Sequence, residues 1–244
     1  PGDYKLFFNA VGDAEFYVDE LFDEVVCPNG GCDTVNQGVT IELAAGSNVL
    51  DEELLAAASI AGAITDTDGL PIAFANVNLF DGQCNFIVGT QTTVDGSYAL
   101  GSFGEGVYYV FVDASDQGFV RELFPDQKRY FPCFPDIAEG QALALGPTDR
   151  LTGIDLQLDA GGVISGLISG PEGVLGFNQG QARLYAGNGD QLLVVNNREP
   201  DNSYLMSGVL PGTYYMVLSS RNLGLVDEVY DDVDCPRFSC GPEA

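Results

Sequence analysis

The chain of 244 residues contains no histidine. Without histidine, neither a Ser-His-Asp triad nor a Cys-His pair can form. Ser-Lys pairs and paired carboxylates remain open, but 36 acidic residues make chance pairs common, and no positioned base or nucleophile stands out among them. We therefore predict that the chain is not an enzyme.

Basic residues and long apolar runs are also scarce. Lysine and arginine number 9 against 36 acidic residues, which gives a net charge of -27. Such a surface repels nucleic acids and anionic membranes, and it suits a saline solvent, cations or basic proteins. No run of 18 apolar residues occurs, so the sequence predicts no transmembrane helix. We expect neither a nucleic-acid partner nor membrane insertion.

The six cysteines predict disulfides. Two pairs have C-x4-C spacing, and structural zinc would need four thiolate or imidazole ligands at each site. Disulfide bonds imply an oxidising compartment, outside the cell or at its surface. The expected bonds are Cys27–Cys32, Cys235–Cys240 and, from the two cysteines left over, Cys84–Cys133.

A Gly-x-Tyr step recurs at Gly2, Gly106 and Gly212, a period of about 105 residues. A period of that length is a whole domain. Apolar residues make up 45 % of the chain, so each repeat can bury a core, and the 31 glycines and 12 prolines indicate many turns between short apolar runs. This pattern predicts an all-β protein.

The repeat divides the chain into three parts. Residues 1–57 form the C-terminal part of one β-sandwich repeat, residues 58–160 a complete repeat, and residues 161–244 a repeat without its closing strands. The complete repeat carries seven or eight short strands spaced 8–15 residues apart, which is typical of a sandwich. Residues 50–55 are interpreted as a strand because their counterpart, 153–158, alternates apolar and polar residues.

The long segment 125–140 is rich in proline and aromatic residues. Its Tyr130, Phe131 and Phe134 fit two interpretations, contact with a sugar or protein ligand and packing of the loop.

Three stretches of the middle repeat resemble a known domain family. Residues 60–79 read Ile-x-Gly-x-Ile-Thr-Asp-x-x-Gly-Leu-Pro-Ile-Ala-x-Ala-x-Val-x-Leu, 92–100 read Thr-x-x-Asp-Gly-Ser-Tyr-x-Leu, and 106–112 read Gly-x-Tyr-Tyr-Val-x-Val. They resemble carboxypeptidase-regulatory-like domains, which belong to the prealbumin-like (transthyretin-like, Cna-B-like) β-sandwiches. The resemblance covers residues 58–114 and, less closely, 163–218.

The resemblance implies tandem seven-stranded, immunoglobulin-like sandwiches that act as stalk, spacer or adhesion modules on bacterial surface proteins. Cna-B-like domains often carry a lysine in the first strand that forms an isopeptide bond. The first strands here, 59–65 and 163–169, contain no lysine, so we expect no such bond.

Acidic residues crowd beside the terminal cysteines, where carboxylates and loop carbonyls could supply the six to eight oxygens that calcium requires. No EF-hand pattern is present, and a solvated acidic surface explains the same residues. The candidate calcium ligands are Asp227, Glu228, Asp231, Asp232 and Asp234 at one end, and Asp19, Glu20 and Asp23 at the other.

Together these patterns predict an extracellular structural repeat protein that forms a stalk, fibre or filament on a bacterial surface. Its partners are copies of itself, either as a fibre assembled by strand complementation or within a longer tandem array. The Gly-x-Tyr-to-Cys segment occurs at both ends, which favours the array. The alternative is a carbohydrate- or protein-binding accessory module of a secreted enzyme or adhesin.

Overall fold

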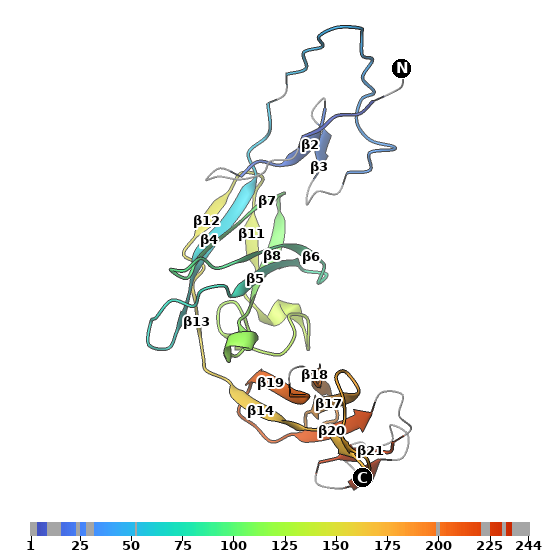
Figure 1. Cartoon of the computed structure of the whole chain (residues 1–244). Coiled ribbons are helices and arrows are strands. Elements are labelled where there is room, and N and C mark those ends of the chain that lie inside the picture. The colour runs from blue at the N-terminus through green and yellow to red at the C-terminus, as the bar shows by residue number, and fades with distance from the viewer. Residues whose placement is uncertain are drawn as a thin grey trace. The chain divides into compact units, whose positions relative to one another are not determined.

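The computed structural model describes residues 4–8, 16–22, 25–27, 32–51, 53–198, 201–220, 225–230 and 233–235. Residues 233–235 are described by their backbone alone. The chain forms two compact units. The first comprises Pro1–Asp113, Glu122–Gln127 and Phe131–Leu158, and the second comprises Ala114–Arg121, Lys128–Tyr130 and Asp159–Ala244. Almost all regular structure in both units is strand, which confirms the all-β prediction (Figure 1).

The first unit contains a β-sandwich. In one sheet, β4 (Ala58–Asp66) pairs antiparallel with β7 (Ser97–Phe103) and parallel with β12 (Arg150–Thr152) and β13 (Leu156–Leu158). The second sheet is built on β6 (Phe86–Gln91), β5 (Asn76–Asp81), β8 (Gly106–Asp113), β9 (Glu122–Leu123) and β11 (Leu143–Leu145). Strand β10 (Gln127–Lys128) pairs with β9 at the end of this sheet, and the 3-10 turn η3 (Ile137–Glu139) lies in the long loop.

Period-two alternation decides which side chains form the core of this sandwich. Ile60 and Ile64 in β4 and Val77 and Leu79 in β5 are fully buried, and each pair is separated by an even number of residues. Even spacing places the side chains on one face of a strand, so both strands direct their apolar residues between the two sheets.

Strand β8 is buried on both of its faces. Tyr109 and Phe111 alternate with the core residues of this strand and cluster on the outer face with Leu123 and Ile137. The proline-rich loop covers this outer face, and the Cys84–Cys133 disulfide pins it there with a Cα–Cα distance of 6.0 Å. Because the bond spans 49 residues, loop closure contributes roughly 4 kcal/mol in the chain-entropy model.

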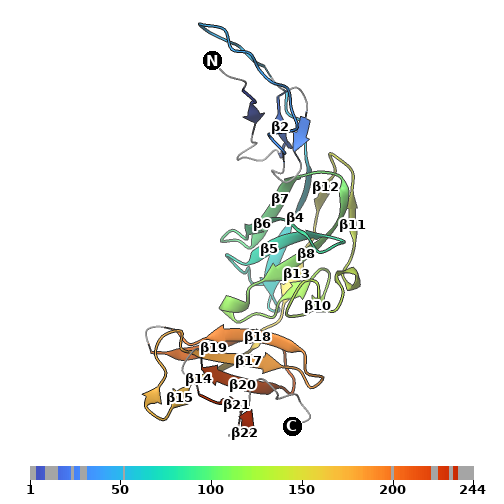
Figure 2. The ribbon, with the colours of Figure 1, turned by 90° about the vertical axis from the view of Figure 1, so that its right-hand side faces the viewer.

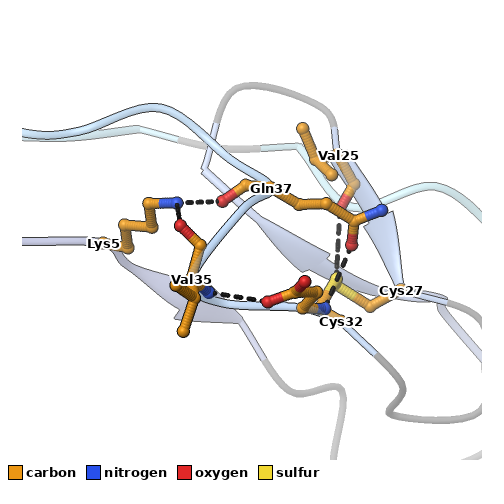
Figure 3. Close-up of a disulfide and its surroundings, with 7 residues drawn as sticks. Lys5, Val25, Cys27, Cys32, Val35 and Gln37 are labelled. Carbon is orange, nitrogen blue, oxygen red and sulfur yellow. Dashed lines mark hydrogen bonds between the residues drawn. A yellow bond between two sulfur atoms is a disulfide. The ribbon is translucent and has the colours of Figure 1, made fainter.

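A small three-stranded sheet lies at the N-terminal end of the first unit, formed by β1 (Phe7–Phe8), β2 (Asp19–Leu21) and β3 (Val25–Cys27). A disulfide joins Cys27 to Cys32, and the ammonium group of Lys5 donates hydrogen bonds to the carbonyls of Val35 and Gln37 in the following loop (Figure 3). This bond spans five residues, so it pins a loop and contributes only about 2 kcal/mol.

The prediction of a strand at residues 50–55 is wrong for the part that the structure describes. Only one isolated bridge, Tyr17 to Ala56, lies beside this segment. The backbone of Leu55 is held instead by the amide of Val18 and the carboxylate of Glu20. The counterpart strand in the complete repeat forms because β4 offers it a ladder. No such ladder lies beside 50–55 in the described residues, and the acidic residues of this segment disfavour a strand.

The second unit repeats the same strand order. In one sheet, β14 (Gly162–Leu167) pairs antiparallel with β19 (Ser203–Val209). The second sheet runs in the order β18 (Gln191–Asn196), β17 (Gly180–Tyr185), β20 (Tyr215–Ser220), β21 (Asp227–Val229) and β22 (Val233–Cys235) (Figure 2). A hairpin of β15 (Ser169–Gly170) and β16 (Gly173–Val174) and the 3-10 turn η2 (Ser115–Gln117) complete the unit.

The repeated Gly-x-Tyr step forms a tyrosine corner. The Tyr108 hydroxyl donates to the carbonyl of Gly104 at 2.9 Å, and the Tyr214 hydroxyl donates to the carbonyl of Leu210 at 2.6 Å. The ring folds back over the glycine two residues earlier, so a Cβ atom on Gly106 would lie 2.8 Å from the Tyr108 hydroxyl oxygen. The repeated glycine is therefore a packing requirement of the corner.

Tyr130 packs within the second unit, where it extends this corner. Its hydroxyl accepts a hydrogen bond from the amide of Leu210 and donates one to the Tyr214 hydroxyl, both at 3.1 Å. The side chain is 9 % exposed, whereas Phe131 and Phe134 are 45 % and 50 % exposed. The loop-packing interpretation is thus correct for Tyr130, and the two phenylalanines keep an exposed face.

Replacing Gly106 with alanine tests this packing role. We expect Gly106→Ala to lower the free energy of unfolding by about 2 kcal/mol, because the added methyl group overlaps the Tyr108 ring. Gly82→Ala is the matched control, since its Cβ would meet no atom closer than 4.0 Å. Urea unfolding followed by circular dichroism measures both, and equal losses in the two variants would contradict the corner.

Candidate strand-docking edge

One extended segment closes the sandwich of the first unit. Strands β12 and β13 both run parallel to β4, with Arg150 beside Ser59 and Leu156 beside Ile64 (Figure 1). Gly153 separates the two strands, with a φ of 77° that favours glycine. Residues 150–158 therefore act as one interrupted closing strand along the outer edge of β4.

A glycine and a tyrosine position this closing strand. Gly62 in β4 lies directly opposite Tyr98 in β7, and the Tyr98 hydroxyl donates to the carbonyl of Ile154 at 2.7 Å. A Cβ atom on Gly62 would lie 2.0 Å from the same carbonyl oxygen. The missing side chain lets the closing strand approach β4 while the tyrosine binds it.

The hydrogen bonds to β4 alternate along its closing edge. Ser59 donates its amide to the carbonyl of Asp149 at 2.9 Å, and Ala61 accepts at its carbonyl from Ile154 at 3.2 Å. The amide of Ala63 donates to the side-chain carboxylate of Asp155 at 2.8 Å. Burial of the Tyr98 hydroxyl, together with the Asp155 charge, raises the pKa of Tyr98 well above its usual range.

The same glycine and tyrosine recur in the second unit. Gly166 in β14 lies opposite Tyr204 in β19, and a Cβ atom on Gly166 would lie 3.0 Å from the Tyr204 ring. Among the described residues, however, β14 pairs with β19 alone, and the Tyr204 hydroxyl makes no hydrogen bond. Burial, and to a lesser extent nearby Tyr230, raises the pKa of this hydroxyl.

In the part of the chain that the structure describes, the outer edge of β14 is therefore open. Ile60 in the first unit is fully buried, whereas its counterpart Ile164 is partly exposed, and Val163 and Leu167 are 60 % and 52 % exposed. A cavity of about 450 Å³ opens between the two sheets at this edge. It is lined by Ile164, Ser165, Leu184, Tyr204, Tyr214, Tyr215, Met216 and Tyr230.

A short turn fixes where each edge tyrosine begins. The Asp95 carboxylate accepts hydrogen bonds from the hydroxyl groups of Thr93 and Ser97, which lower its pKa in that order. Asp201 accepts from the amide and the hydroxyl of Ser203, and these bonds lower its pKa likewise. The Asp-x-Ser turn is therefore built alike in both units and sets the register of the tyrosine that follows it.

The predicted calcium ligands whose side chains the structure describes lie on two short strands. Asp19 and Glu20 are in β2, and Asp227 and Glu228 are in β21. Neighbouring residues of a strand point to opposite faces, so neither pair converges on one point. Burial raises the pKa of Asp227, and nearby Arg183 opposes that shift.

No group of three or more acidic or cysteine side chains that could hold a metal occurs among the residues that the structure describes. Asp23, Asp231, Asp232 and Cys240 lie outside the described residues, as does the side chain of Asp234. The calcium site and the Cys235–Cys240 disulfide therefore stay predictions.

The sequence contains both halves of the docking edge as separate motifs. Gly62 and Gly166 stand in the Ile-x-Gly motif of the first strand, and Tyr98 and Tyr204 follow the Asp-x-Ser turn. Their recurrence in both repeats was the available signal. Their contact depends on the register of two strands that are separated by some 35 residues, which neither motif encodes.

Comparison with known proteins adds little to this description. No family model matches the sequence, and no curated protein matches it. The TIE protein of Bacillus anthracis is 10 % identical over 83 % of this chain and 36 % of that chain, with a TM-score of 0.33. A streptococcal ancillary pilin is 10 % identical over 99 % of this chain and 74 % of that chain, with a TM-score of 0.32.

The solved structure of an enzyme is similar to this chain to about the same degree. A catechol 1,2-dioxygenase of Acinetobacter radioresistens is 14 % identical over 43 % of this chain and 52 % of that chain, with a TM-score of 0.29. The chain thus spans about a third of the TIE protein and half of the dioxygenase. Likenesses at TM-scores this low support no inference about function, and the resemblance to carboxypeptidase-regulatory-like domains stays a prediction. No helix among the described residues is long and apolar enough to cross a membrane.

The two edge tyrosines should respond differently to loss of the hydroxyl. We expect Tyr98→Phe to lower the stability of the first unit by about 1–2 kcal/mol, because the buried carbonyl of Ile154 loses its partner. Tyr204→Phe should change the stability of the second unit by less than about 0.5 kcal/mol, since no described group bonds its hydroxyl. Hydrogen-exchange mass spectrometry in urea resolves the two units, and a similar loss in both would contradict the open edge.

Proposed function

We propose that the chain is a non-enzymatic structural protein of the cell exterior, in which tandem β-sandwiches build a stalk, fibre or filament on a bacterial surface. Its partners in this role are copies of itself or further repeats of the same kind. The observation that carries the proposal is the outer edge of β14, beside which no strand lies within the described residues, while a closing strand fills the equivalent edge of β4.

An open edge of this kind favours assembly. A strand with unpaired amides and carbonyls accepts another strand, and an apolar cavity beside the edge adds the burial of side chains. Each added strand completes one sandwich and links it to the polypeptide that supplied the strand. Repeated strand addition therefore extends a fibre without forming covalent bonds.

The disulfides support an extracellular location. The structure contains Cys27–Cys32 and Cys84–Cys133 bonds, which persist in oxidising compartments. The net charge of -27 fits a protein that stays soluble in a saline medium.

Self-association tests the proposal. We expect the 25.9 kDa polypeptide to form larger species as its concentration rises, measured by light scattering after size-exclusion chromatography. Val163→Pro should weaken this association at least tenfold, because proline removes an edge amide at a residue that the β14–β19 ladder skips. Val163→Thr, which keeps the amide, is the matched control. The donor is residues 150–158 of a second copy, which pair with β4 of their own chain before the exchange. A strict monomer at every soluble concentration would therefore overturn assembly by exchange of this strand.

A binding module for carbohydrate or protein is the second candidate. The observation in its favour is the exposure of Phe131 and Phe134, at 45 % and 50 %, on a disulfide-pinned loop. A glycan array distinguishes the two functions: a spacer binds no glycan, whereas a module would bind one and lose it in Phe131→Ser and Phe134→Ser. Phe74→Ser, at another exposed phenylalanine, is the control.

A further inference from the structure

We propose that the edge of β14 takes one extended strand that runs parallel to it and has the sequence pattern of residues 150–158, so that the occupant is a closing strand of this repeat's own kind. The inference rests on the proposed function and specifies its partner. It adds the direction of the added strand, its register and the residues that recognise it. The template is the first unit, where such a strand occupies the equivalent edge.

The backbone of β14 offers the same sequence of donors and acceptors as β4. On β4, the closing strand is met by the amide of Ser59, the carbonyl of Ala61 and the amide of Ala63. The equivalent groups on β14 are the amide of Val163, the carbonyl of Ser165 and the amide of Leu167, because Gly62–Tyr98 and Gly166–Tyr204 fix a common register. In the described part of the chain, no strand lies beside them.

The glycine and tyrosine define a recognition point for a backbone carbonyl. In the first unit, the space above Gly62 and the Tyr98 hydroxyl together hold the carbonyl oxygen of Ile154. Gly166 likewise has no side chain, and the Tyr204 hydroxyl lies 3.0 Å from the place of its absent Cβ atom, lines the cavity and makes no hydrogen bond among the described residues. An arriving backbone carbonyl would therefore gain one hydrogen bond from this hydroxyl.

The cavity selects the side chains of the added strand. In the closing strand of the first unit, Ile154, Leu156 and Leu158 are 5 %, 2 % and 0 % exposed, whereas Gln157 is exposed. Three apolar side chains at alternate positions therefore enter the core and the residues between them face out. The cavity beside β14 is lined by Ile164, Leu184 and Met216, which are apolar partners for such side chains.

This chemistry disfavours the other candidate within the chain, residues 48–55 of a second copy. That segment places acidic residues, Asp51 and Glu53, near the middle of the strand, where the pattern requires burial. It also lacks a glycine at the position where Gly153 turns the closing strand.

A labelled peptide with the sequence of residues 148–159 tests the inference directly. We expect saturable binding to the whole chain by fluorescence anisotropy. The peptide substitution Leu156→Asp should weaken binding at least 30-fold, because a charge replaces a buried leucine. Gln157→Lys should leave affinity within twofold, since this side chain faces out. Peptide variants leave the folding of the protein unchanged.

Protein variants test the recognition point. Tyr204→Phe should weaken peptide binding about fivefold by removing one hydrogen bond. Gly166→Ala should weaken it further by blocking the carbonyl, and hydrogen exchange verifies that this variant is folded. Tyr215→Phe is the control, because Tyr215 lines the same cavity without lying opposite Gly166.

The direction of the strand has its own readout. A spin label at the peptide's N-terminus should broaden the NMR signals near Val163, and a label at its C-terminus those near Ile168. The reverse pattern, no binding, or tighter binding of a peptide of residues 48–55 would overturn the inference. Binding of the peptide by a chain that never self-associates would overturn the assembly function and leave the inference standing. Self-association that neither Tyr204→Phe nor the peptide changes would overturn the inference and leave the assembly function standing.

Discussion

The outer edge of the first strand is the constraint on which the rest of each sandwich depends. The first strand has β7 or β19 on one side, and its other side carries amides and carbonyls that need partners. In the first unit, residues 150–158 satisfy them and bring three apolar side chains into the core. In the second unit, no strand of the described residues pairs with the outer edge of β14, which lies beside a cavity, and no described group bonds the Tyr204 hydroxyl.

Glycines in this protein make room for tyrosine rings. Gly106 and Gly212 lie under the rings of Tyr108 and Tyr214, whose hydroxyls bond the backbone four residues earlier. Gly62 gives the same kind of room to a partner strand, which Tyr98 then binds. A tyrosine anchors backbone well, because its ring fills apolar space while its hydroxyl reaches a carbonyl. The recurrence of these glycines therefore marks places where backbone, ring and strand meet.

The sequence predicts the parts of this fold that depend on local pattern. The predicted first strand, residues 59–65, matches β4, and the Gly-x-Tyr step at Gly106 marks the start of β8, although only the structure shows that a disulfide-pinned loop buries the outer face of β8. Residues 50–55 were predicted by analogy with 153–158, and the analogy failed because a closing strand needs a neighbour more than a propensity. The contact between Gly62 and Tyr98 could not be predicted, since it depends on the register of β4 against β7.

Net charge and edge recognition act in opposite directions, and the balance makes an open edge tolerable. An exposed strand edge accepts almost any extended chain and is a hazard for aggregation. At a net charge of -27, copies repel each other beyond contact, and salt screens that repulsion over about 10 Å at 0.1 M. Short-range terms must therefore hold the added strand: a carbonyl over Gly166, a hydrogen bond from Tyr204 and apolar side chains in the cavity. A strand without that pattern meets the repulsion and gains too little to overcome it.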